Sequence, residues 1–125
     1  MVDIMNFTLF GNPITKKNSQ QIIMCNGRPM IIPSKQYKQY ENDCLKQIGT
    51  NHEPLECVVN VKCVYYMETK RRVDLTNLLE ATDDILVRAN ILKDDNCNIV
   101  YSHDGSHVVL GCKDNPRVEI TIDEL

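Results

Sequence analysis

Residues 71–90 read RRVDLTNLLEATDDILVRAN, and this stretch carries a clear helical pattern. Leucine, isoleucine and alanine recur at three- and four-residue spacing, which predicts a helix running to about Asn90 with an apolar stripe along one side. Asp74 or Thr76 is suited to cap its first turn, because a short side-chain oxygen can accept from a free backbone N–H. The polar residues of the stretch fall on the opposite face: Asn77, Glu80, Asp84 and Arg88.

The chain before this helix predicts strands and a second helix. Residues 55–67 are rich in valine, cysteine and tyrosine and predict a long strand that delivers the chain to Lys70. Residues 35–48 have apolar residues at helical spacing, with Ser34 as N-cap and Gly49 at the end. Further upstream, a strand is expected over 5–10 and a hairpin over 21–25 and 28–32, because Asn26-Gly27 is a strong two-residue turn signal.

Two or three further strands are expected after the helix, near residues 98–102, 106–110 and 117–122, with Asp104-Gly105 as a second hairpin turn. The order is β-β-β-α-β-α-β-β. The sequence therefore predicts an α+β fold in a single domain over residues 1–125, with a mixed β-sheet and two main helices.

Composition is that of a globular protein without a membrane span. The chain has 125 residues, a net charge of -3 and 42% hydrophobic residues, and no apolar run approaches the roughly 18 to 20 residues of a membrane helix. The N-terminal residues lack a basic segment followed by an apolar one, so we expect a cytoplasmic protein. The six cysteines have no short C-x-x-C spacing, and we expect them to be reduced and largely buried.

Acidic and basic residues gather around the 71–90 helix. Asp83-Asp84 lie within it and Asp94-Asp95 follow it, while Arg71-Arg72 precede it. Carboxylates held close together repel each other, and a divalent metal ion is the first candidate to balance them. Basic residues beside them suit a polyanionic substrate. This combination points toward phosphodiester chemistry.

Several motifs are similar to those of the RusA family of Holliday junction resolvases, small bacterial and prophage endonucleases. The resemblance covers nearly the whole chain. The matching stretches are P-I-T-K-K-N-S over residues 13–19, the segment from Pro33 to Tyr40, D-L-T-N-L over 74–78, D-I-L over 84–86, Asp94-Asp95, and P-R-V-E-I-T-I over 116–122.

The resemblance implies a set of catalytic and metal-binding residues. Asp74 matches the first aspartate of the family's D-x-D motif, and Asp95 matches the second of its D-D pair. Thr76 stands where the second aspartate of D-x-D is expected, and Glu80 stands where a lysine is expected. Glu80 and Asp84 lie six and ten residues after Asp74 and share its side of the helix, so both are candidates to replace the missing ligand.

The resemblance also implies the reaction and the partners. We expect Mg²⁺, with Mn²⁺ as an alternative, to assist hydrolysis of the DNA backbone. The substrate would be branched DNA, in the form of a four-way junction in recombination and repair, and the enzyme would act as a homodimer that makes paired cuts. Four basic residues would contact phosphates: Lys16, Lys17, Arg71 and Arg72.

Two other functions stay open. Thr76 and Glu80 favour a junction-binding protein with weakened catalysis, and the acidic pI near 5.5 favours a small α/β protein-interaction module. Local alternatives stay open as well. Capping of the helix is the alternative role for Asp74, and His103 is interpreted as a turn residue.

Overall fold

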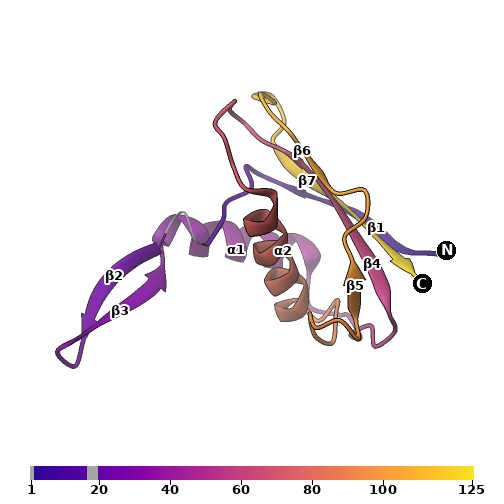
Figure 1. Ribbon diagram of the computed structural model, residues 1–125, viewed down its shortest axis with the longest axis horizontal. Helices are drawn as coiled ribbons and strands as arrows, with labels where there is room; N and C mark the ends of the chain where they lie inside the picture. The colour runs from indigo at the N-terminus through magenta and orange to yellow at the C-terminus, as the bar shows by residue number, and fades with distance from the viewer. Residues whose placement is uncertain (1, 17–19) are drawn as a thin grey trace.

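The computed structural model describes residues 2–16 and 20–125 (Figure 1). It contains two helices and seven strands among these residues, in the order that the sequence predicts. They are β1 (Val2–Phe10), β2 (Gln20–Cys25), β3 (Arg28–Pro33), α1 (Lys35–Ile48), β4 (Val59–Tyr66), α2 (Leu75–Arg88), β5 (Val100–Ser102), β6 (His107–Val109) and β7 (Arg117–Glu124).

Five strands form one mixed sheet with the order β1-β7-β4-β5, and β6 also pairs with β4. The β1–β7 and β7–β4 pairs are antiparallel, whereas β5 and β6 run parallel to β4. β7 alternates between buried and partly exposed residues, which is the pattern of a strand with one face on the core. The fold is therefore the mixed-sheet α+β domain expected from the sequence.

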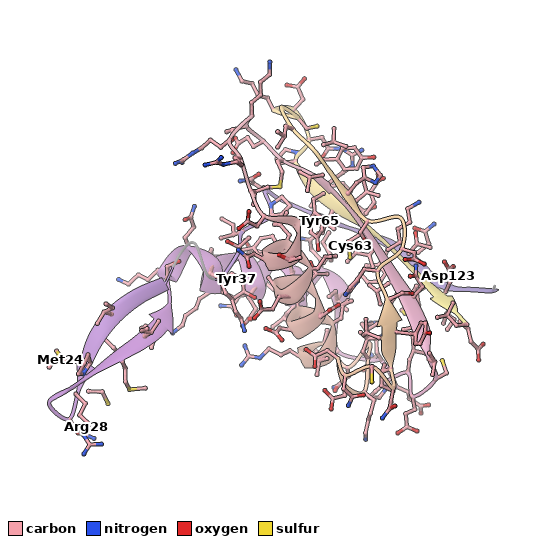
Figure 2. The ribbon with its side chains drawn as sticks, viewed as in Figure 1. Met24, Arg28, Tyr37, Cys63, Tyr65 and Asp123 are labelled. Atoms are coloured by element: carbon pink, nitrogen blue, oxygen red, sulfur yellow. The ribbon has the colours of Figure 1, made fainter. Side chains whose placement is uncertain are left out.

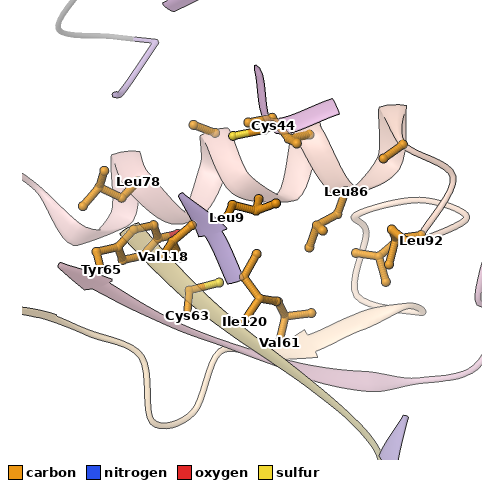
Figure 3. Close-up of a cluster of buried hydrophobic side chains, with 14 of the residues drawn as sticks. Leu9, Cys44, Val61, Cys63, Tyr65, Leu78, Leu86, Leu92, Val118 and Ile120 are labelled. Atoms are coloured by element: carbon orange, nitrogen blue, oxygen red, sulfur yellow. The ribbon is translucent and has the colours of Figure 1, made fainter. Parts of the chain in front are cut away.

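Both helices lie on one side of this sheet, as Figure 1 shows. Ser34 caps α1 as expected, because its Oγ accepts a hydrogen bond of 3.1 Å from the Tyr37 N–H. Gly49 ends that helix with a φ of 84°, a conformation that glycine adopts without strain. The side chains between helices and sheet form the core, drawn in part in Figure 3. Its largest fully buried members include Tyr37, Tyr65, Leu86 and Ile120.

The expected hairpin turn at Asp104-Gly105 is wrong. β5 and β6 do not pair with each other; they follow one another along the same edge of β4. Between them, side chains replace the missing ladder bonds: His103 Nδ1 lies 2.8 Å from the Val61 carbonyl oxygen, and Ser106 Oγ accepts from the Cys63 N–H at 2.9 Å. These contacts let an interrupted edge strand run parallel to β4, which a turn signal alone does not reveal.

The six cysteines are unpaired in the structure. Only Cys44 and Cys63 are buried, whereas Cys25 and Cys97 are exposed, so the expectation that the cysteines are largely buried is wrong. Neither of the two helices in the described residues is long and apolar enough to cross a membrane.

Candidate active site

The main pocket of interest lies beside the C-terminal half of α2. It has a volume of about 490 Å³ and is open to solvent on one side. Asp84 on α2 and Asp95 in the following loop both contribute to its wall, so two of the predicted site residues share one pocket. Residues from the N-terminal loop, from α1 and from α2 complete the lining: Lys16, Tyr37, Lys38, Glu41, Val87 and Arg88.

Two ion pairs fix charges in this pocket. Lys16 Nζ lies 2.6 Å from Asp84 Oδ2, and both side chains keep about a third of their surface exposed, at 34% and 30%. Arg88 pairs with the largely buried Glu41 of α1. The pairs join the N-terminal loop and α1 to α2, and they leave cationic groups beside the two aspartates.

The carboxyl group of Asp95 responds to its surroundings. Partial burial is the largest cause of its raised pKa. The interaction with the Asp94 side chain comes next, and then the negative charges of other aspartates, Asp84 foremost. Raised carboxyl pKa values of this kind occur where carboxylates face each other at functional sites. Asp84 and Asp95 thus line the same pocket and act on each other electrostatically.

Tyr37 adds a neutral polar group to the same pocket. Burial raises the pKa of its hydroxyl above the ordinary value, and the charges of Glu41 and Asp84 reinforce the shift. The phenol therefore stays protonated and keeps a hydrogen atom that it can donate.

Asp74 lies at the other end of α2. It occupies the N-cap position, but its side chain makes no capping hydrogen bond; instead it accepts one of 3.3 Å from Asn77 Nδ2. Ten residues of helix separate it from Asp84, which corresponds to about 15 Å along the axis. Glu80 is exposed midway along α2 and is not part of the pocket wall among the described residues. A single chain therefore brings together Asp84 and Asp95, but not the full predicted set.

The predicted phosphate contacts fall in two places. Lys16 lies at the pocket, whereas Arg71 and Arg72 are exposed and line a separate hollow of about 340 Å³ near the start of α2. Lys17 lies outside the described residues.

The residues present fit only part of a metal site. Within the described ranges 2–16 and 20–125, no group of three or more histidine, cysteine, aspartate or glutamate side chains is placed to hold one metal ion. Mg²⁺ usually keeps several water ligands and needs only one or two protein carboxylates together with substrate phosphate. Asp84 and Asp95 supply two carboxylates to one pocket.

Asp83 and Asp84 point to different surroundings although they are neighbours in sequence. Asp83 is buried, and its Oδ2 lies 2.9 Å from Nε2 of His103, whose Nδ1 contacts the Val61 carbonyl oxygen. His103 begins the turn that the sequence suggested, because its carbonyl oxygen accepts from the Ser106 N–H at 3.1 Å, and its partly buried ring also links Asp83 of α2 to β4. Both of its ring nitrogens face acceptors, a geometry that only the doubly protonated imidazolium satisfies in full when Asp83 is ionised.

Sequence reasoning missed three polar members of the pocket wall: Lys38, Glu41 and Arg88. One signal was available, because Arg88 lies one helical turn after Asp84 on the same face of α2. No comparable signal exists for the α1 residues, because their approach to α2 depends on tertiary packing.

The chain matches one known protein family over most of its length. Residues 11–123 match the family model described as "Endodeoxyribonuclease RusA". A search of curated proteins found no match. Because the family match covers nearly all of the chain, the chain belongs to the RusA endodeoxyribonuclease family.

Proposed function

We propose that this member of the RusA family is a metal-dependent endonuclease that hydrolyses the backbone of four-way DNA junctions. The observation that carries the proposal is the pair of carboxylates, Asp84 and Asp95, in one open pocket beside cationic side chains. The family supplies the reaction class, and the pocket supplies the residues that would perform it.

The pocket has the groups that phosphodiester hydrolysis needs. Asp84 and Asp95 would hold Mg²⁺ or Mn²⁺, which when bound supplies Lewis acidity for the phosphoryl oxygen and for an attacking water. Lys16, held against Asp84, and the exposed Lys38 offset the negative charge of the approaching backbone.

We further propose that the enzyme acts as a homodimer. Asp74 matches the family's D-x-D motif but lies about 15 Å along α2 from Asp84, too far to bind the same ion within one chain. A second copy could place its own Asp74 beside the Asp84–Asp95 pocket. A two-fold pair of sites also suits paired cuts in a symmetric junction.

Mixed dimers test this arrangement. Asp74→Asn and Asp95→Asn should each lose cleavage as pure proteins, and a mixture should regain part of it, because one hybrid site then has all its carboxylates. A mixture as inactive as its components would show that Asp74 acts within its own chain or not at all.

The substrate class is tested with synthetic DNA. Purified protein with Mg²⁺ or Mn²⁺ should nick a four-way junction in preference to a linear duplex of the same sequence. Equal cleavage of both would refute junction selectivity. Tight junction binding without nicking in either metal would remove the enzyme and favour the second candidate, a junction-binding protein with weakened catalysis, for which Thr76 and Glu80 are the motivating residues.

A third candidate, a protein-interaction module, predicts no salt-dependent DNA binding. The setting we propose for the enzyme is DNA recombination and repair in the cytoplasm of a bacterium, with the gene carried by the bacterium or a prophage.

A further inference from the structure

The β2–β3 hairpin extends away from the helices and the five-stranded sheet, as Figure 1 shows. It forms a two-stranded sheet of its own, joined by a tight turn in which Asn26 and Gly27 both have positive φ, at 52° and 77°. A two-stranded hairpin without further packing is only marginally stable in water. Its extended form therefore calls for a partner surface.

One face of this hairpin presents four neighbouring apolar side chains. Ile22 lies opposite Ile31, and Met24 lies opposite Pro29, so their four side chains share a face. Ile22, Met24 and Ile31 are 72%, 68% and 65% exposed, and Pro29 is exposed as well. We call these four residues the ribbon face; Met24 is labelled at its far end in Figure 2. Contiguous exposed apolar side chains of this kind mark interaction surfaces.

We propose that the ribbon face is the surface on which a second copy of this chain docks, ribbon face against ribbon face about a two-fold axis. An isologous contact brings each residue near its own counterpart, so charged residues would repel across it. The ribbon face has none. This inference deepens the homodimer of the proposed function, on which it rests, by naming its contact surface.

The charge of the hairpin favours protein over DNA as the occupant. Arg28, at the turn, is the only charged residue in the hairpin sequence from Gln20 to Pro33. Binding along a DNA backbone relies on several lysine and arginine contacts, each replacing a counterion. The basic residues near the pocket, Lys16 and Lys38, lie off the hairpin instead.

The connection to α1 gives this contact a consequence for the pocket. β3 ends at Pro33 and α1 begins at Lys35, so the hairpin is joined to the helix almost directly. α1 contributes Lys38 and Glu41 to the pocket wall. Pairing two hairpins therefore sets the position of one pocket relative to the other.

Sedimentation tests the contact with the full chain and without DNA. The wild type should sediment at micromolar concentration as a species of twice the 14.4 kDa chain mass. Ile22→Asp with Ile31→Asp should raise the Kd for dimer formation about a hundredfold or more, because like charges would face each other across the axis. Leu110→Asp, an exposed aliphatic residue outside the hairpin at 44%, is the matched control and should stay dimeric.

Hydrogen exchange shows whether the double variant is still folded. In the wild type the hairpin amides should be protected, and in the double variant they should exchange fast while β4 and β7 stay protected. A wild type that is monomeric, or a double variant that stays dimeric, overturns the proposal. Hairpin protection that arises only on adding junction DNA would make DNA the occupant and overturn it as well. A double variant that stays dimeric and cleaves junctions would refute this surface while leaving the proposed function intact. A wild type that dimerises through the hairpin but does not cleave would do the reverse.

Discussion

The Asp83–His103 pair makes the stability of this protein depend on pH in a defined direction. The interaction with Asp83 raises the pKa of His103 above its usual 6.5, against the opposing effect of burial. A raised folded-state pKa means that the stabilisation is fully present below about pH 6.5 and is lost as the pH rises through the pKa of the folded protein. The pair should therefore stabilise most on the acidic side.

Replacing the His103 imidazole measures how much the Asp83–His103 pair stabilises the fold. The side chains of Asp83 and His103 are only 12% and 24% exposed, and Asp83 Oδ1 is already buried without a hydrogen-bond partner among the described residues. Breaking a buried ion pair costs about 3 to 5 kcal/mol, and the partial exposure of His103 favours the lower end. We expect His103→Asn to lose about 3 kcal/mol near pH 5.5, and about 1 kcal/mol near pH 8.5, where the neutral ring donates only one hydrogen bond.

Urea unfolding followed by circular dichroism measures this loss. With a slope of about 2 kcal/mol per molar urea, the midpoint of His103→Asn should fall by roughly 1.5 M near pH 5.5. His107→Asn is the matched control, because His107 is exposed and its ring contacts the nearby Gly105 carbonyl oxygen. It should change stability by less than about 0.5 kcal/mol. Equal losses for His103→Asn at both pH values, or a loss no larger than the control's, would refute the charged pair.

Three further changes test the helices and the pocket. Ser34→Ala should lower the free energy of unfolding by about 1 kcal/mol, because the Tyr37 N–H loses its acceptor, and an unchanged urea midpoint would contradict that cap. Leu86→Ala should cost about 2 to 5 kcal/mol, since Leu86 is fully buried, whereas the exposed Leu110→Ala should cost little in the same assay. Lys38→Ala should weaken junction binding and reduce the salt dependence of the binding constant by about one ion. Lys46→Ala, on the part of α1 away from the pocket, is the control and should change neither. Equal salt slopes for the two variants would show that Lys38 does not contact DNA.

Local signals in the sequence predicted most of the fold because they act within a few residues. Ser34 and Gly49 mark the two ends of α1, and Asn26-Gly27 marks the hairpin, since each depends on its own backbone conformation. Asp104-Gly105 carries a similar signal and misled. The turn itself forms, with the Ser106 N–H donating to the His103 carbonyl oxygen. The side chains of His103 and Ser106 bond to β4, however, and the two flanking strands pair with β4 rather than with each other.

The site was predictable only in part, because it depends on how distant elements pack. The sequence indicated Asp84 and Asp95 as site residues, and the structure brings them to one pocket. It did not reveal that Asp83, one residue away, faces His103 instead, since that depends on which side of α2 meets the sheet. Placing Asp74 in the same site ignored the length of the helix between them.

The most direct test of the central claim is the cleavage rate of Asp95→Asn on a four-way junction with Mg²⁺. Cleavage should be abolished while junction affinity in a gel-shift assay stays near the wild-type value, because the metal-binding carboxylate is lost and the cationic contacts remain. Asp114→Asn, at an exposed aspartate outside the pocket, should cleave like the wild type. An Asp95→Asn protein that cleaves at the wild-type rate would contradict the assignment of this pocket as the active site.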